Sequence, residues 1–226
     1  MNIYGKIFKG RFLKDKGKLR ILTNFVFTVI FLLSVIYLIR YRLNLKKAAE
    51  ISQDALYPLK ESEFASLLVP VEWKEMTPLK KHSRSYQYVK WGTVFALLIL
   101  VVILAIVITT EFLSSSFFSL AYLFYLIISL VRHQGNLYIL PNGIILNGKY
   151  YSASQIHQYE TEQIVRWHEL YGYHSRVDNG YKLTFDIKKK TIQPDYMIVE
   201  DSSHLRQITA LLDQQGIKGV QKTEKN

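Results

Sequence analysis

Two uncharged apolar runs, separated by three residues, constrain the fold of this chain more than any other feature. The first covers residues 91–108 and the second residues 112–131, with only Thr109, Thr110 and Glu111 between them. About 20 apolar residues in a helix match the thickness of a bilayer's hydrocarbon core, about 30 Å. Two tandem helices that are apolar on all sides exceed what a small soluble domain can cover. Residues 91–131 are therefore predicted to form a transmembrane hairpin.

A third apolar run covers residues 21–39, and Arg40 and Arg42 follow it directly. It is longer than the apolar region of a secretory signal peptide, about 7 to 15 residues, and no small-residue cleavage site follows it. We therefore expect a first transmembrane helix at residues 21–39. Residues 1–20 hold seven Lys or Arg and a single Asp. This composition predicts a basic, mobile tail exposed to the cytosol or at the membrane surface.

The basic residues are concentrated beside the apolar runs. The net charge of the chain is +11; residues 1–132 hold 18 Lys or Arg against 8 Asp or Glu, and residues 133–226 hold 11 against 10. A nucleic-acid binder needs its positive charge on the folded binding domain, because phosphate contacts supply much of the affinity. The distribution instead favours membrane lipids as partners and excludes nucleic acid. The chain has no cysteine, which excludes disulfides and thiolate chemistry.

Charge also indicates orientation. Residues 40–90, expected to be a linker with short helices, hold ten Lys or Arg, and Arg132 adds one after the last apolar run, against seven in residues 1–20. Basic loops stay preferentially in the cytoplasm. The count favours a multi-pass protein of the cell membrane whose linker and C-terminal domain are cytoplasmic, and the opposite orientation is the alternative. The interiors of the runs lack Asp, Glu, Lys, Arg and His, which argues against transport by this chain alone.

The remaining C-terminal residues resemble a small β-rich domain. Asn-Gly pairs at 142–143 and 147–148, and Asp-Asn-Gly at 178–180, are typical of tight turns between strands. Residues 203–215 have helical spacing of apolar side chains, with cap residues before them and Gly216 after them. Residues 217–226 are expected to be a flexible tail. The expected strands lie at residues 137–140, 144–146, 149–151, 155–159, 164–173, 181–188 and 196–199.

The hairpin, the opening stretch at residues 136–144 and the closing helix at residues 203–215 carry a resemblance to a family. Together they resemble the bacterial YcxB-like group, in which a transmembrane hairpin leads into a pleckstrin-homology-like (PH-like) domain. The resemblance implies an α+β PH-like domain at residues 133–216: a curled antiparallel sheet of six or seven strands with one C-terminal helix. It also implies a binding role without catalysis. The N-terminal span and the long linker depart from the simplest two-span pattern.

Catalytic and metal-binding patterns are weak. His157, His168 and His174 are the only group that suggests a site, but they lack the helical spacing of a zinc motif. On one continuous strand His168 and His174 would lie about 20 Å apart. We therefore expect no cofactor, no metal and no enzymatic activity. The aromatic residues Trp167, Tyr171, Tyr173 and Tyr181 are interpreted as core side chains.

Lys188, Lys189 and Lys190 form the one basic cluster in the domain and are candidate contacts for a lipid headgroup, with a solvated loop as the alternative. The leading functional hypothesis is a membrane protein whose PH-like domain serves protein interaction or self-assembly. The second is sensing of anionic lipids through the basic segments. The third is an enzyme that uses the histidines.

Overall fold

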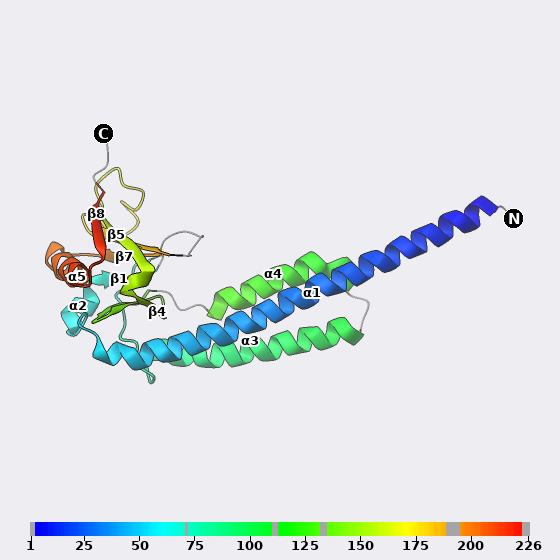
Figure 1. Ribbon diagram of the computed structural model, residues 1–226, viewed down its shortest axis with the longest axis horizontal. Coiled ribbons are helices and arrows are strands. Elements are labelled where there is room, and N and C mark those ends of the chain that lie inside the picture. Colours follow the sequence, from blue (N-terminus) through cyan, green and yellow to red (C-terminus); the bar gives the residue numbers. More distant parts are fainter. Residues whose placement is uncertain (1–2, 71, 110–112, 132–134, 189–194, 223–226) are drawn as a thin grey trace. The chain divides into compact units, whose positions relative to one another are not determined.

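The computed structural model describes residues 3–70, 72–109, 113–131, 135–188 and 195–222, and it divides the chain into two compact units (Figure 1). The helical unit contains Met1–Arg42 and Tyr88–Arg132. The sheet unit contains Leu43–Gln87 and His133–Asn226. The chain therefore passes between the two units three times. Residues 43–87, expected to be a linker, fold with the C-terminal domain as one body.

Three helices supply the helical unit: α1 (Ile3–Ile51), α3 (Arg84–Thr109) and α4 (Leu113–Val131). Two segments, Ile21–Asp54 and Tyr86–Val107, are long and apolar enough to cross a membrane. The third predicted span is also helical over its described residues, as α4. Residues 3–20, expected to be a basic tail, are helical, since α1 begins at Ile3 and continues through them.

Short elements follow α1 in the sheet unit: the 3-10 helix η1 (Ser52–Asp54), α2 (Glu61–Ala65) and the strand β1 (Leu67–Leu68). Near the end of α1, Leu45, Ala48 and Ala49 are buried in this unit. β1 was not predicted. It pairs antiparallel with β7, which ties residues 43–87 to the C-terminal part of the chain.

A three-stranded antiparallel sheet comes next, with β2 (Leu137–Leu140), β3 (Gly143–Leu146) and β4 (Lys149–Ser152) in that order. These strands confirm three of the predicted ones. Asn147 and Gly148 connect β3 to β4 with φ angles of 51° and 73°. Positive φ at both central residues is what a tight hairpin turn requires, which is why an Asn-Gly pair predicts it.

The second sheet has five strands in the order β1-β7-β6-β5-β8. β5 (Ile156–Gln163), β6 (Tyr181–Ile187) and β7 (Asp195–Val199) form an antiparallel meander, and β8 (Lys218–Gln221) pairs parallel with β5. The sheet is therefore mixed, whereas the sequence predicted one antiparallel sheet of six or seven strands. Residues 218–221 form a strand, so the expectation of a flexible tail is wrong at these residues.

The helix α5 (Ser202–Gln214) confirms the predicted C-terminal helix and its ends. The carboxylate of Asp201 accepts a hydrogen bond from the backbone N–H of Ser203, and Gly216 stops the helix with φ 74°. Ile208 and Leu212 are its buried residues. They lie four positions apart, on one face of the helix.

The strand predicted at residues 164–173 is absent; the described residues 164–180 form a series of turns. Backbone hydrogen bonds join Ile164 N–H to Gly180 carbonyl and Asn179 N–H to Ile164 carbonyl, which closes the segment at its base. Three of its apolar residues, Ile164, Leu170 and Val177, face inward although the backbone is irregular. Together they form one buried cluster with strands β1 and β7, made of Leu68, Ile164, Leu170, Val177 and Ile198.

Candidate functional site

The helical unit has a buried face on each of its helices. The buried positions recur every three or four residues, as expected for helices packed along a seam. The ring of Phe124 on α4 lies 5.4 Å from that of Phe27 and 6.3 Å from that of Phe31, so α1 and α4 pack against each other. The buried residues are Phe27, Phe31, Ser34 and Leu38 on α1, Val89, Thr93, Ala96, Leu100 and Ile103 on α3, and Phe124, Ile127 and Val131 on α4.

The outward faces of the same helices are also apolar. Phe95 on α3 is 66% exposed and Phe25 on α1 is 66% exposed. A water-soluble helix bundle places polar residues on that face, because exposed apolar surface costs about 25 cal/mol per Å². These outward faces therefore suit an apolar solvent. The exposed apolar residues include Leu32, Leu33, Ile36 and Ile39 on α1, Leu98, Val101, Val102 and Ile106 on α3, and Leu123 and Leu126 on α4.

Three hydroxyl groups within the apolar parts of these helices are satisfied inside their own helix. The hydroxyl groups of Ser34, Thr93 and Ser129 each donate to the backbone carbonyl four residues earlier, at 2.7–2.8 Å. Such bonds satisfy these three hydroxyl groups without water. At the start of the apolar part of α3, Lys90 Nζ lies 5.5 Å from the ring centre of Trp91, which is largely exposed. Trp and Lys are typical of the membrane–water boundary.

The sheet unit contains a cavity of about 560 Å³, lined by residues that follow α1 and by one residue of β2. Phe64 on α2 and Tyr138 on β2 form part of its apolar wall, with ring centres 6.0 Å apart. The hydroxyl of Tyr138 accepts a hydrogen bond from Leu79 N–H at 2.6 Å, which holds residues 75–80 beside β2. Burial raises the pKa of Tyr138 to about 12. The lining residues are Ser52, Gln53, Pro58, Leu59, Glu61, Phe64, Ala65, Glu75, Met76, Thr77, Pro78, Leu79, Lys80 and Tyr138.

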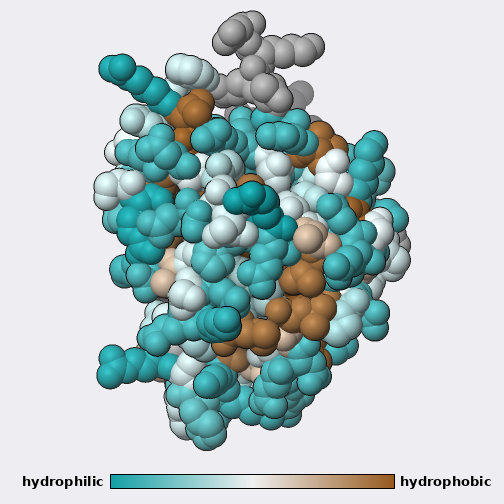
Figure 2. Space-filling model, turned by 90° about the vertical axis from the view of Figure 1, so that its left-hand side faces the viewer, coloured by the Kyte–Doolittle hydropathy of each residue, from teal (hydrophilic) through white to brown (hydrophobic). Residues whose placement is uncertain are grey.

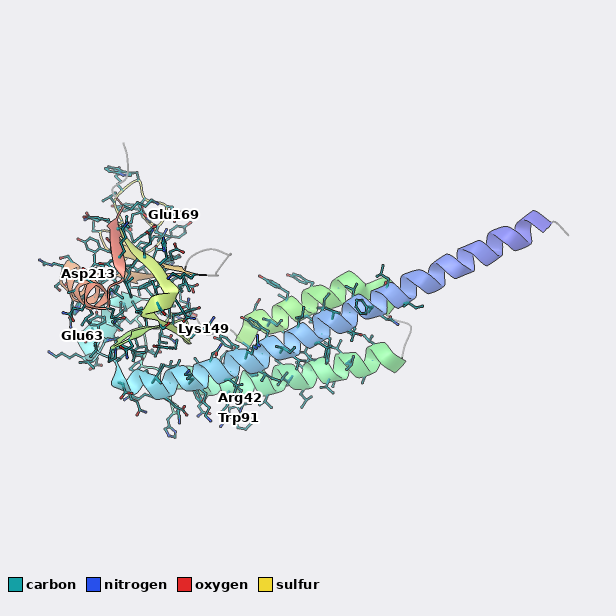
Figure 3. The ribbon with its side chains drawn as sticks, in the orientation of Figure 1. Arg42, Glu63, Trp91, Lys149, Glu169 and Asp213 are labelled. Atoms are coloured by element: carbon teal, nitrogen blue, oxygen red, sulfur yellow. The ribbon has the colours of Figure 1, made fainter. Side chains whose placement is uncertain are left out.

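Charges of both signs lie around this cavity. Glu75 is paired with Arg176, Nη1 to Oε1 at 2.7 Å, whereas Glu61 and Lys80 are exposed. Glu63, labelled in Figure 3, is buried and its carboxylate accepts from the backbone N–H groups of Leu59 and Lys60. Glu63 therefore fixes the start of α2, which leaves Glu61 and Lys80 as the charges available to a bound molecule.

Arg176 joins three parts of the sheet unit. Its guanidinium donates to the carboxylate of Glu200 after β7, to Glu75 and to the backbone carbonyl of Ala65. The two carboxylates raise the pKa of Arg176. An arginine offers five donors in a fixed fork, so it can hold several acceptors at once. The segment containing Glu75 is thus anchored on one side by Arg176 and on the other by Tyr138.

The predicted lysine cluster is described only in part. Lys188 is exposed and its Nζ donates to the carbonyl of Ser154 at 2.8 Å, while Lys189 and Lys190 lie outside the described residues. A headgroup role for the three lysines stays a prediction.

The predicted histidines are not brought together as a site. His157 is exposed on β5. His168 Nδ1 accepts from the backbone N–H of Leu170 at 3.0 Å, and His174 Nδ1 accepts from that of Arg176 at 3.2 Å. Both side chains therefore stabilise turns in residues 164–180. Among the described residues, no group of three or more His, Asp or Glu is arranged to hold a metal ion.

The interpretation of the aromatic group as core is wrong for most of its members. Trp167 is 71% exposed and Tyr173 is 65% exposed, and Tyr171 is also on the surface. Trp73 packs against the buried cluster and lies 5.9 Å from the ring of Tyr173, centre to centre. Because residues 164–180 form turns instead of a strand, side chains that alternate in the sequence do not share one buried face.

Sequence reasoning missed the cavity. Its lining comes mainly from residues 52–80, which have no strong periodic pattern, and the only distant contributor is Tyr138. The Pro residues at 58, 70 and 78 indicate breaks in regular structure, but they do not indicate which surfaces meet. Comparison of the chain with protein-family models, with curated proteins and with solved structures gives no match.

Proposed function

We propose that this chain is an integral, multi-pass protein of the cell membrane that presents a folded module for protein interaction on one side of the bilayer. The main support is the exposed apolar surface of the helical unit, together with hydroxyl groups that bond within their own helices. Only a lipid environment accommodates exposed apolar helices with internally bonded hydroxyl groups without a cost in free energy. Three spans, α1, α3 and α4, place the N-terminus and the sheet unit on opposite sides.

Membrane integration is tested by extraction of isolated membranes. The chain is expected to stay in the pellet after washing with alkaline carbonate or with high salt, and to dissolve only in detergent. A protein held by its basic residues alone would leave the membrane in high salt, because surface electrostatic attraction is screened. Release by salt would therefore overturn the proposal.

We further propose that the sheet unit is a PH-like module and that it is cytoplasmic. Two antiparallel three-stranded meanders, β2–β4 and β5–β7, followed by α5, support the PH-like arrangement. The strands β1 and β8 are additions to it. The excess of basic residues in residues 40–90 supports the cytoplasmic side. Because fold does not give function, the interaction role is argued from the surface of the unit.

The surface of the sheet unit supports an interaction role more than a catalytic one. Figure 2 shows an apolar patch near the middle of a mostly hydrophilic face of the molecule. Leu56 and Leu59 are exposed apolar residues of this unit, and Leu59 also lines the cavity. Copurification from mild detergent is expected to yield a complex larger than the monomer. A strictly monomeric chain without a specific partner would contradict the interaction role.

A further inference from the structure

Residues 75–77 lie along the outer side of β1, at the edge of the five-stranded sheet. The isolated bridge between Leu68 and Glu75 is antiparallel, and its two hydrogen bonds run from Val69 N–H to Lys74 carbonyl and from Met76 N–H to Leu67 carbonyl. In this pattern the bridged residues themselves point their N–H and C=O groups away from each other. The backbone groups of Glu75 therefore face away from β1.

The same alternation applies two residues later. Met76 uses its N–H toward β1, so the backbone groups of Thr77 point outward like those of Glu75. Within the described part of the chain, no hydrogen bond involves the backbone N–H of Glu75 or Thr77. An edge with free donors and acceptors is a template for one more strand, which folded proteins usually protect. Here both residues are exposed and both line the cavity.

Resting on the interaction role proposed above, we propose that this edge and the adjoining cavity bind an extended peptide segment of a partner protein, added as a further strand beside residues 75–77. Main-chain hydrogen bonds supply affinity in this mode of recognition, and pockets for alternate side chains supply specificity. The cavity offers such a pocket, with Phe64, Met76 and Tyr138 in its wall. A small soluble ligand would leave the outward backbone groups of the edge unused.

The chemistry of the peptide follows from the cavity wall. An apolar side chain suits the aromatic and thioether surface, since a large apolar residue gains about 1.5–3 kcal/mol from burial. Glu61 and Lys80 are exposed and have no side-chain partner among the described residues, whereas Glu75 is held by Arg176. A basic residue of the peptide would lie near Glu61 and an acidic one near Lys80.

The test removes one backbone N–H group that points outward from the edge. Thr77→Pro deletes the N–H of residue 77, which makes no internal bond, and Thr77→Ala is the matched control because it keeps that N–H. The probes are 12-residue peptides selected from a random display library on the full chain in detergent. Fluorescence anisotropy then measures their dissociation constants for the wild type and both variants. Loss of one main-chain hydrogen bond is expected to weaken binding about tenfold in Thr77→Pro, and Thr77→Ala should bind as the wild type does.

A second pair of variants tests the charges. Glu61→Lys should weaken binding of peptides with a basic residue, whereas Glu72→Lys makes the same charge change at an exposed position that does not line the cavity and should have no effect. Circular dichroism and thermal unfolding check that each variant folds. If Thr77→Pro does not fold, the peptide itself is N-methylated at successive positions, which removes its donors one at a time.

The outcomes are distinct. Equal binding to the wild type and Thr77→Pro, or failure of any peptide to enrich, would overturn the peptide site. A concentration-dependent dimer abolished by Thr77→Pro, without peptide enrichment, would assign the edge to a second copy of the chain and overturn it as well. Neither result affects membrane integration, which carbonate extraction tests separately.

Discussion

Gly143 is the residue at which one added methyl group is expected to damage the sheet unit most. A Cβ at this position would lie 2.1 Å from the carbonyl oxygen of Tyr151 on β4, whereas a Cβ at Gly172 would meet nothing within 4 Å. Gly143→Ala is predicted to destabilise the unit by about 3 kcal/mol, because backbone and not a flexible side chain must move. Gly172→Ala, with φ +85°, should cost about 1 kcal/mol. Denaturant unfolding measures both, and equal losses would contradict the close approach of β3 and β4.

Tyr138 and Tyr151 link stability to alkaline pH. Burial raises the pKa of both phenols to about 12 from the ordinary value of 10.0, and the nearby Asp195 carboxylate adds to the effect on Tyr151. A raised pKa gives stability that is complete below pH 10 and is lost as the pH rises toward 12. Unfolding free energy is therefore predicted to fall over that window. Tyr138→Phe should reduce the slope of the unfolding free energy against pH. It should also cost about 1 kcal/mol of stability at neutral pH, because Leu79 N–H loses its acceptor. An unchanged slope would contradict the burial of Tyr138.

Residues that act through local chemistry were predictable, and residues that act through distant contacts were not. Asn147 and Gly148 predict their turn because the positive φ values are a property of those two residues. Arg176 gives no comparable signal. Its acceptors, at Ala65, Glu75 and Glu200, are as much as 111 positions away, so only the fold shows that it joins them.

The cap of α5 allows a prediction at the level of one element. The hydroxyl and backbone N–H groups of Ser203 lower the pKa of Asp201, so the carboxylate contributes stability above its ordinary pKa and loses it as the pH falls. Asp201→Ala is expected to lower the unfolding temperature of the sheet unit, and Asp201→Asn, which keeps an acceptor oxygen, to lower it by less. Thermal unfolding at pH 7 compares the two variants. If alanine and asparagine were equivalent there, the cap would have no role in holding α5.

Elements with their own periodic pattern were predicted, and elements that depend on pairing partners were missed. β6 alternates apolar and polar residues, and the prediction at residues 181–188 matches Tyr181–Ile187 closely. β1 has two residues and β8 has four, so neither is long enough to show a recognisable pattern. They exist because β7 and β5 offer them edges to pair with. The strand prediction at residues 164–173 failed for a different reason. The sequence alternates as a strand does, but backbone hydrogen bonds and the side chain of His168 fold it into turns.

Folding of residues 43–87 with the C-terminal part has a consequence for the whole molecule. β1 pairs with β7, so both parts of the sheet unit must lie on the same side of a membrane. With three spans, the N-terminus then lies on the other side.

The chain has no cysteine, so single-cysteine variants label without background. Gly5→Cys and the exposed position Ala210→Cys on α5 are predicted to react with an impermeant maleimide from opposite sides of sealed vesicles. Labelling of both from one side would mean an even number of spans.

The most direct test of the account is a water-accessibility scan of α3. Phe95, Leu98 and Val102 are exposed apolar residues of this helix, and each is replaced singly by cysteine. In membranes without detergent, these three positions are predicted to react with a water-soluble maleimide at least about tenfold more slowly than Ala210→Cys, because thiolate formation requires water. Denaturing detergent should remove the difference. Rapid labelling of all three positions in intact membranes would show that the helical unit lies in water and would contradict the membrane assignment.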